Sequence, residues 1–401
     1  MGFVKGIFKV VLKTFVVLLL VGVGLLIATN ASIVYDYAEP HAFAGPDIYN
    51  PYRNLDTTNG WKRANFHTHT RVRGVFNECE FWPDSVCRIY ESFGYDIIGI
   101  SNHNEITPLS ADQESRMSIY EHGYNPLKFH ISVYGSPKVW HFDNMLPIFP
   151  FQHQFIIDRL GSDADIVQLN HPVRTPIISR DGLEKIGGYQ LIELASNMAN
   201  IENEYWDWAL TAGHYSHGIQ NDDMHRPYDA GNIAVRCSFL STHDKSYASI
   251  RQSLLDGCFY SMRIPDYGEC DWQDKIDANA SLPCVEDIGL RGDTIYIKLS
   301  DSADSIKFVG AGHRALRVVE ASDTAAYALP ACEPYTRIMA FYPDGTVIYS
   351  NVFARYDSSQ SDSPFRDDTY TPNWTLTLLY NLIIVLCVVS IIIVIYKVVR
   401  R

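Results

Sequence analysis

Residues 65–70 read NFHTHT, which places two imidazoles two positions apart in a run typical of a β-strand. Side chains at positions i and i+2 of a strand point to the same face, so His67 and His69 can bind one metal ion together. A divalent ion held in this way favours hydrolytic chemistry, because it activates water and polarises an electrophile. The pair alone is a weak indication, and it gains weight only if further ligands follow downstream.

Further candidate ligands do recur along the chain, most of them at or just after the end of a predicted strand. They are His103 after the apolar run 96–101, Glu121, His130 at the start of 129–134, His171 after 165–169, and Asp223 with His225 after 215–220. In barrels that alternate strands and helices, catalytic groups gather at the carboxyl ends of the strands. We therefore expect these side chains to converge in one site.

The order of strands and helices predicts the architecture that must position them. Short apolar strands alternate with helical stretches from residue 62 to about residue 263, which indicates an α/β barrel or a doubly wound sheet. After Pro283 only strand-like runs follow, at 294–299, 306–309, 316–320, 337–342 and 346–352. The turn at 343–345 (PDG) joins the last two as a hairpin. We predict a small all-β sandwich for this second region.

Two uncharged segments, 14–35 and 375–396, are each long enough to cross a bilayer. Basic residues lie outside both of them, within 1–13 and 397–401. The positive-inside rule then places both termini in the cytoplasm and the bulk of the chain on the far side of the membrane. A cleaved signal peptide is the alternative for the first segment. Its apolar run is longer than a usual signal core, which favours a retained anchor.

Charge and cysteine content limit the partners and the compartment. The formal net charge is −13, and six of the basic residues lie in the two terminal segments, so the region between is more acidic still. So acidic a domain disfavours nucleic acid as a partner. Seven of the eight cysteines would face an oxidising space. Cys79 with Cys87, and Cys270 with Cys284, are close enough in sequence for loop-closing disulfides, although the pairing is not determined.

The order His-x-His, His, Glu, His, His-Pro and Asp-x-His over residues 62–263 resembles the PHP (polymerase and histidinol phosphatase) superfamily. This resemblance implies an α/β fold, a distorted (β/α)7 TIM-like barrel that holds two or three metal ions and cleaves phosphoester bonds. The strands that follow resemble an Ig-like β-sandwich found on secreted members. The predicted order is a basic N-terminus at 1–13, a transmembrane helix at 14–35, a linker at 36–61, the barrel at 62–272, the sandwich at 283–356, a linker at 357–374, a transmembrane helix at 375–396 and a basic tail at 397–401.

The same resemblance assigns the ligands position by position. One ion is expected at His67, His69, Glu121 and Asp223, a second at Glu121, His130 and His171, and a third facing His103 and His225. Mixed imidazole and carboxylate ligands suit zinc, manganese or iron, and the sequence does not choose among them.

Two positions depart from the family pattern. Asn102 stands in Ser-Asn-His where members usually carry Thr-Asp-His, so a supporting carboxylate is missing. Val75 stands about six residues after the second histidine, where another His or Asp is usual, with Asn77 or Glu78 as the available substitutes. These departures predict a weak or empty third metal site beside a complete two-metal pair.

Four further residues are candidates for direct roles in catalysis. Arg174, just beyond His171, is the first candidate for stabilising negative charge in a transition state, with Arg71 and then Arg73 behind it. An ordinary surface or salt-bridging role is the alternative for each arginine. His243 follows the predicted strand 233–240 and is a candidate proton donor.

These observations predict a membrane-anchored, exoplasmic, metal-dependent phosphoesterase. Its substrate would be a phosphomonoester or phosphodiester, and its location alone suggests a lipid headgroup or lipid-linked phosphate. One alternative is an amidohydrolase-type metallohydrolase, which also opens with His-x-His but usually needs a bridging lysine. Another is a catalytically inactive barrel that serves as a binding or scaffolding module, an interpretation supported by Val75 and Asn102.

Overall fold

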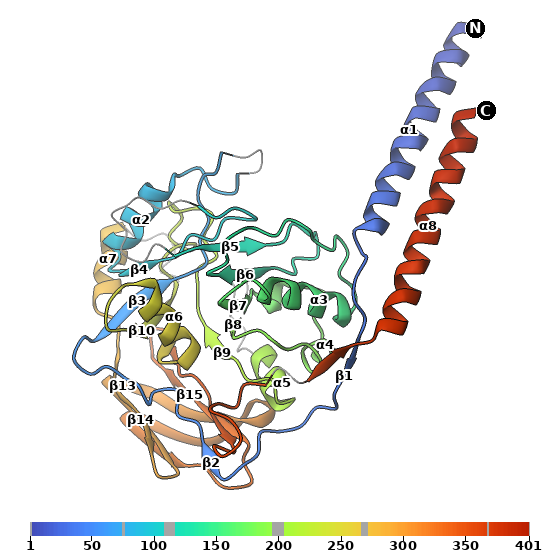
Figure 1. Cartoon of the computed structure of the whole chain (residues 1–401). Coiled ribbons are helices and arrows are strands. Elements are labelled where there is room, and N and C mark those ends of the chain that lie inside the picture. Colours follow the sequence, from blue (N-terminus) through green and yellow to red (C-terminus); the bar gives the residue numbers. More distant parts are fainter. Residues whose placement is uncertain are drawn as a thin grey trace.

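The structure is a computed structural model of the chain, and it describes residues 2–73, 77–107, 117–194, 204–265, 272–366 and 369–400. It has an α/β body from which two long helices leave side by side (Figure 1). Val75 and Cys270, which entered the sequence predictions, lie outside the described residues.

The helices of the body are short and lie around the sheets. They are α2 (Pro83–Ser92), α3 (Pro150–Gly161), α4 (Arg180–Leu183), α5 (Glu204–Thr211), α6 (Tyr247–Asp256) and α7 (Trp272–Ala280), with the 3-10 turns η1 (Pro172–Arg174) and η2 (Ala311–His313). Local sequence sets their ends, as in α6. There the Ser246 hydroxyl accepts a hydrogen bond from the Ser249 amide, and Gly257 closes the helix at a φ of 74°.

A five-stranded sheet forms one side of the body. Its spatial order is β5 (Ile119–His122), β6 (Ile131–Tyr134), β7 (Ile166–Leu169), β8 (Leu191–Glu193) and β9 (His217–Ile219). The first three strands run antiparallel to one another, and β7, β8 and β9 are parallel. All five are buried along their whole length, which fits strands that are covered on both faces.

A larger sheet forms the other side and carries most of the C-terminal strands. Its main path is β12 (Val285–Arg291), β13 (Thr294–Gly310), β15 (Tyr335–Phe341), β16 (Val347–Tyr349), β11 (Phe259–Arg263), β10 (Arg236–Ser241), β3 (Trp61–Asn65) and β4 (Ile97–Ile98). Off this path lie β14 (Arg314–Ala328), β17 (Phe353–Tyr356) and β2 (Asp47–Ile48). The predicted hairpin at 343–345 joins β15 to β16.

The sheet is continuous across the predicted boundary between barrel and sandwich. Strand β16 pairs with β11, with Met262 opposite Ile348. One apolar core contains Tyr90 and Tyr260 from the first region together with Ile306 and Phe353 from the second. The C-terminal strands therefore share a sheet and a core with the α/β region, and the described residues show no separate β-sandwich.

The two sheets meet without closing into a barrel, so the predicted closed (β/α)7 barrel is not seen among the described residues. Isolated bridges link them, Thr68 with Met224 and His103 with Glu121. The first bridge joins the segment after β3 to the segment after β9, and the second joins the segment after β4 to β5. Four short segments thus lie side by side. Candidate ligands lie on or beside all four of them.

The two long helices are α1 (Gly2–Ala28) and α8 (Trp374–Arg400), and both are long and apolar enough to cross a membrane. They pack against each other, and Lys13 Nζ donates to the carbonyl of Val399 at 3.1 Å. The chain beyond them is ordered, because β1 (Tyr35–Tyr37) pairs with β18 (Tyr370–Pro372) and β2 pairs with β17. Both predicted linkers therefore contribute strands that attach the helices to the body.

The suggested disulfide between Cys79 and Cys87 is not formed. Both residues belong to the described part of the chain, both are buried, and no bond joins their sulfur atoms.

Candidate metal centre

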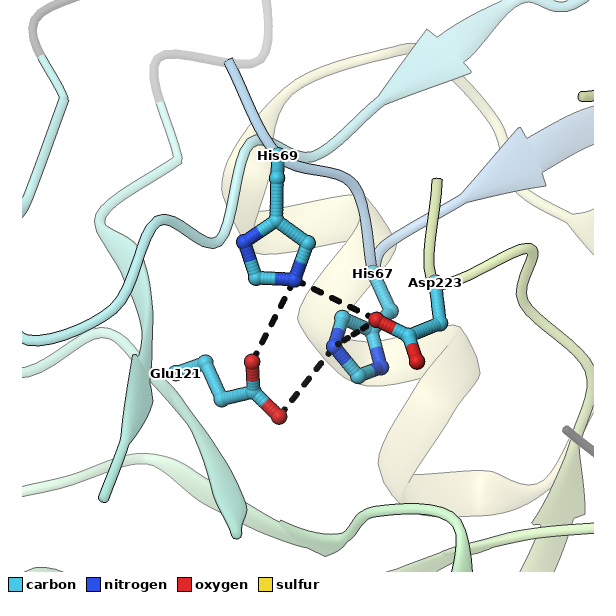
Figure 2. Close-up of side chains that lie close together, drawn as sticks. All are labelled: His67, His69, Glu121 and Asp223. Carbon is cyan, nitrogen blue, oxygen red and sulfur yellow. Dashed lines mark ion pairs between the residues drawn. The ribbon is translucent and has the colours of Figure 1, made fainter. Parts of the chain in front are cut away.

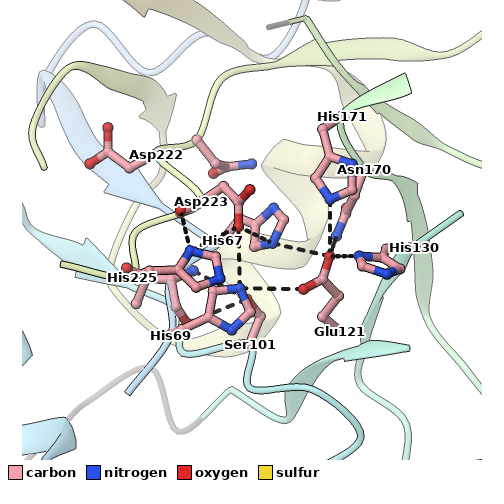
Figure 3. A network of polar contacts seen from close by, with 12 residues as sticks. His67, His69, Ser101, Glu121, His130, Asn170, His171, Asp222, Asp223 and His225 are labelled. Carbon is pink, nitrogen blue, oxygen red and sulfur yellow. Dashed lines mark hydrogen bonds and ion pairs between the residues drawn. The ribbon is translucent and has the colours of Figure 1, made fainter. Parts of the chain in front are cut away.

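Strand ends from both sheets bring the predicted ligands together in one cluster (Figure 3). Residues after β3 contribute two histidines, residues after β4, β7 and β9 contribute others, β5 contributes the glutamate, and the residue before β6 contributes one more histidine. All eight predicted ligands are part of it: His67, His69, His103, Glu121, His130, His171, Asp223 and His225.

The first group consists of His67, His69, Glu121 and Asp223, all buried (Figure 2). Nε2 of His67 lies 3.2 Å from Oε1 of Glu121 and 3.2 Å from Oδ1 of Asp223. Nε2 of His69 lies 3.3 Å from Oε2 of Glu121 and 3.3 Å from Oδ1 of Asp223. Two imidazole nitrogens and two carboxylates thus surround a common point.

These separations fit a metal ion better than they fit hydrogen bonds. Tetrahedral zinc with bonds of about 2.0–2.1 Å holds neighbouring ligand atoms roughly 3.3 Å apart. The Nε2 atoms of His67 and His69 are buried and have no hydrogen-bond partner, which is costly unless a cation binds them. The donor set therefore fits a divalent ion in both chemistry and spacing.

The second group shares Glu121 with the first. Oε1 of Glu121 lies 3.3 Å from Nδ1 of His130 and 3.4 Å from Nε2 of His171. One carboxylate therefore faces histidines on both sides, as a bridging ligand between two ions must. This arrangement is the one that the family resemblance implied for Glu121, His130 and His171.

A third group forms around Glu78, which the sequence offered only as a substitute for the ligand missing at Val75. Oε2 of Glu78 lies 3.3 Å from Nδ1 of His69, 3.2 Å from Nε2 of His103 and 3.7 Å from Nε2 of His225. His103 also lies 3.1 Å from Oε2 of Glu121, so it stands between the second and third groups. Of the two substitutes that the sequence offered, Glu78 is the one that lies beside these histidines, and the weak or empty third site stays a prediction.

Glu193 is a supporting residue that the sequence analysis missed. Oε1 of Glu193 accepts a hydrogen bond from Nδ1 of His67 at 2.8 Å and another from Asn221 Nδ2 at 3.1 Å, while Oε2 accepts from the backbone amide of His171 at 2.8 Å. Such a carboxylate fixes the imidazole tautomer and directs Nε2 to the metal position. The available signal was an acidic residue near the end of the predicted strand 189–194, directly after two apolar residues.

Two asparagines fix other parts of the cluster. Asn170 Nδ2 donates to Oε1 of Glu121 at 2.8 Å and so orients the bridging carboxylate. Asn102, the residue that departs from the family pattern, accepts from the amide of Thr70 at 2.8 Å and donates to the hydroxyl of Thr107 at 2.6 Å. Its amide therefore holds the loop that follows His69, a role that needs a donor as well as an acceptor.

The backbone is strained at this site. Asn104, His171 and Asp223 have φ values of 49°, 26° and 52°, in the left-handed region that L-residues rarely adopt. Strain of this kind persists only where the surrounding structure imposes it, and it is concentrated at functional sites. Two of the three residues are candidate ligands, so their side chains are directed inward at a conformational cost.

Electrostatics favours ionised carboxylates and bound cations. Burial opposes the charge on Glu121, but His103, His67 and His130 outweigh it and hold the pKa of Glu121 well below its ordinary value. Burial likewise opposes the charge on Glu78, and the imidazole of His225 leads the groups that lower its pKa to about 2. The carboxylates therefore stay negative at neutral pH, which concentrates negative charge in a nearly closed space.

Three of the predicted catalytic residues, Arg174, Arg71 and His243, have different locations. Arg174 NH1 contacts Oδ2 of Asp223, which places a guanidinium directly beside the first group. Arg71 lines a cavity of about 770 Å³ beside Glu78 and His225 and lies over the ring of Trp82. The structure does not bring His243 to the cluster, because this exposed imidazole faces Asp56. The strand before His243 ends on the side of the sheet away from the ligands.

Comparison with known proteins adds little to this geometry. No protein-family model and no curated protein sequence matches the chain. Among solved structures, the chain is similar to a Bacteroides vulgatus protein described as a two-domain protein containing predicted PHP-like metal-dependent phosphoesterase. The TM-score is 0.36 and the identity 16%, over 80% of this chain and 92% of that chain. Similarity at this level assigns neither a fold nor an activity to this protein.

The chain is therefore a mixed α/β protein with two apolar terminal helices and a buried cluster of histidines and carboxylates. The composition and spacing of this cluster suit the binding of a divalent metal ion.

Proposed function

We propose that this protein is a membrane-anchored, metal-dependent phosphoesterase of the PHP type. The observation that supports this proposal most strongly is the group formed by His67, His69, Glu121 and Asp223, with ligand separations of 3.2–3.3 Å. Glu121 extends this group toward His130 and His171, so the side chains present can hold two ions. Glu78 with His103 and His225 provides the ligands for a third.

The side chains around the centre would have separate roles in hydrolysis. Divalent ions bound there would lower the pKa of a water molecule and neutralise phosphate oxygens. Arg174 contacts Asp223 and follows His171 by three residues, so its guanidinium can stabilise the negative charge that develops on phosphate. Glu193 keeps His67 in the tautomer that presents Nε2 to the metal position.

The cavity beside the third group is where the organic part of a substrate would bind. It contains Arg71 and Arg226 as cations, together with the aromatic rings of Phe81 and Tyr228. Glu78 and Glu80 also line the cavity, so an anionic substrate would contact the two arginines and its leaving group the aromatic rings.

The membrane setting is part of the same proposal. Basic residues lie in the first half of α1 and in the last turn of α8, so the positive-inside rule orients both termini toward the cytoplasm and the body toward the exoplasmic side. The chain after α1 is attached to the body through the pairing of β2 with β17, and a body attached to a bilayer in this way favours a phosphate ester carried by a lipid.

The test is to purify the full chain in detergent, measure its metal content, and assay hydrolysis of p-nitrophenyl phosphate and bis-p-nitrophenyl phosphate. The parent is compared with a His67→Ala/His69→Ala variant, with His41→Ala as the control that removes an exposed imidazole elsewhere. We expect the parent and the control to contain zinc, manganese or iron and to hydrolyse at least one ester. The double variant should lose both properties.

Three results would contradict the proposal. A double variant that hydrolyses the esters as fast as the parent would show that the site is wrongly assigned. Hydrolysis of amides without hydrolysis of phosphoesters would favour an amidohydrolase-type activity. A parent chain that binds no metal and hydrolyses nothing would favour the binding or scaffolding module.

A further inference from the structure

An exposed apolar surface lies on the loop before α3. Phe142, Ile148 and Phe149 are 38%, 53% and 50% exposed, whereas the polar residues Asn144 and Gln152 of the same segment are buried. Trp374, the first residue of α8, is 63% exposed. We refer to these four side chains as the apolar collar. Large apolar groups gathered on an exposed surface usually mark a contact with another molecule or with a membrane.

The sequence of this loop is unlike the rest of the acidic body. Residues 139–157 contain one acidic residue, Asp143, and neither lysine nor arginine. Asp143 is only 8% exposed, and its Oδ2 accepts hydrogen bonds from the backbone amides of Tyr124 and Asn125 at 2.9 and 3.0 Å. The one carboxylate therefore faces inward, and the outer surface of the loop has no acidic charge that anionic or zwitterionic lipid would repel.

The loop is attached to the place where the chain leaves α1. Asn144 Nδ2 donates to the carbonyls of Thr29 and Ala31 at 2.8 and 3.2 Å. The side-chain oxygen of Asn30 accepts from the Leu146 amide at 3.2 Å and from Gln152 at 3.2 Å. Because α1 ends at Ala28 and a residue advances the chain by at most roughly 3.5 Å, these contacts lie within one headgroup layer of the apolar span.

Aromatic contacts extend the same attachment to α8. The rings of Phe149 and Phe151 stack at 5.3 Å, and Phe151 meets the ring of Tyr380 edge-on at 5.1 Å. The hydroxyl of Tyr380 donates to the carbonyl of Asn30 at 3.1 Å. The collar is thus continuous with both anchoring helices, and Figure 1 shows α3 beside the point where they leave the body.

Further hydrogen bonds join the segment after α1 to the first turns of α8. Asn381 exchanges two hydrogen bonds with the backbone of Ser32, at 2.8 and 3.2 Å, and Thr377 Oγ1 accepts from the amide of Val34 at 2.9 Å. The β1–β18 ladder pairs the two segments that lead away from these helices, and the Asn144 and Leu146 contacts join the first of these segments to the body. The collar therefore lies on the side of the body that carries the helices.

We propose that the apolar collar inserts into the headgroup region of the membrane that α1 and α8 cross. Its partner is the lipid of that bilayer, and the proposal rests on the membrane anchoring proposed above. Aromatic and aliphatic side chains placed at this depth are favoured, because their rings bury apolar area next to a wet interface. The collar would hold the body flat against the bilayer surface instead of leaving it suspended on two chains.

The collar also connects to the metal centre. Trp140, at the start of the loop, contacts Phe142 at 5.6 Å and stacks on His122 at 5.3 Å. His122 follows the bridging residue Glu121 directly, and its Nδ1 contacts the Trp140 carbonyl at 3.0 Å. Insertion of this loop into the headgroup region would therefore hold the strand that carries Glu121 at a constant distance from the lipid. Such a position suits a substrate whose phosphate lies in the headgroup layer.

Photo-crosslinking of the full chain in phosphatidylcholine vesicles tests this proposal. Phe149 is replaced by p-benzoylphenylalanine, which keeps an aromatic ring at the site. The matched control carries the same probe at Val318, which is 43% exposed on β14 at the end of the body away from the helices (Figure 1). Lipid adducts are measured by mass spectrometry after irradiation, and bound metal is measured to show that each variant is folded.

We expect the probe at position 149 to give several-fold more lipid adduct than the probe at position 318. Equal yields in a chain that resists extraction by alkaline carbonate would overturn the collar proposal and leave the anchoring intact. Extraction of the chain by carbonate would overturn the anchoring and the collar together. An adduct at position 149 with a second copy of the chain, in place of lipid, would show that the collar is a protein interface.

Discussion

Among the described residues, two buried clusters that combine acidic side chains with histidines differ in their chemistry. The candidate metal centre gathers Glu121, Asp223 and Glu78 among imidazole nitrogens. The other cluster joins α5 to the C-terminal strands around Asp207, which is fully buried. Both depend on the charge of a carboxylate, but only the second contains a permanent cation at its centre.

Every acceptor position of Asp207 is used by a protein group. Arg337 Nε donates to Oδ1 at 3.1 Å and NH2 donates to Oδ2 at 2.6 Å, while Tyr335 and His313 contact the same carboxylate. Burial opposes the charge on Asp207, but the guanidinium of Arg337 outweighs it and lowers the pKa of Asp207. The ring of Trp206 lies 5.1 Å from the same guanidinium.

In the candidate metal centre, by contrast, imidazole nitrogens of His67, His69 and His103 are buried without hydrogen-bond partners. Arg174 contacts only the outer oxygen of Asp223. A cluster that folds with so many unused donors and acceptors gains stability when a cation enters it. The comparison teaches that unused imidazole nitrogens around carboxylates, and not burial or acidity alone, distinguish a binding site from a structural ion pair.

The largest effect is expected from breaking the self-contained cluster with Arg337→Met. This change leaves Asp207 buried without its cation, so the free energy of unfolding should fall by about 3–5 kcal/mol. Denaturant titration of the full chain in detergent measures the loss.

Adding zinc or manganese should not restore the lost stability. The double variant Arg337→Met/Asp207→Leu should recover a substantial part, since an apolar pair can replace a buried ion pair. A single variant as stable as the parent would show that the cluster is not a structural ion pair.

A smaller effect is expected from Glu193→Gln in the metal centre. The amide keeps the size of the side chain but no longer holds His67 Nδ1 as a charged acceptor, so metal affinity should weaken by about 10–100-fold. Competition with a fluorescent chelator measures the change. Glu204→Gln, at an exposed position of α5, is the control and should bind metal like the parent. Unchanged affinity in the Glu193 variant would mean that this carboxylate does not support the site.

The smallest effect is expected in the pH dependence of the metal-free chain. Burial opposes protonation of His69, but Asp223 and Glu121 outweigh it and raise its pKa to about 9. A raised pKa means that the proton stabilises the folded metal-free chain fully below about pH 6.5, and that this contribution is lost as the pH rises through about 9. Metal binding releases the proton, so affinity should rise over the same range.

Unfolding midpoints between about pH 6 and pH 10, measured with chelator and with saturating metal, test this expectation. The midpoint of the metal-free chain should fall with rising pH more steeply than that of His69→Gln, which lacks the titrating group. The midpoint of the metal-loaded chain should also fall less steeply with rising pH, because bound metal replaces the proton on His69. Equal slopes in the parent and the variant would indicate that His69 does not retain a proton in the metal-free site.

Much of the candidate site was predictable from the chain because its signals are local. Two histidines spaced by two on a strand, and single histidines just after apolar runs, indicate ligands wherever the strands lie. His67, His103 and His171 were found in this way, and the structure places all three in the cluster. Both terminal helices were visible for the same reason, since length and apolarity are properties of a continuous segment.

Other parts were not predictable because they depend on residues that are distant in the chain. Glu78 lies near His225 only because the segments after β3 and β9 are bridged, and Glu193 supports His67 across two sheets. His243 was placed near the site by strand periodicity, but the direction of the strand puts it on the opposite side. The barrel was expected to close, and the alternation of strands and helices could not reveal that the sheets stay open.

The sequence by itself determined which side chains have metal-binding chemistry, which segments are apolar enough to cross a bilayer, and how acidic the body between them is. Only the tertiary structure decided which carboxylates complete the centre, that the C-terminal strands extend the same sheet, and that the loop before α3 lies beside the anchors. Periodicity and composition act over a few residues along the chain, whereas ligand sets, sheet edges and surfaces form between segments up to hundreds of residues apart.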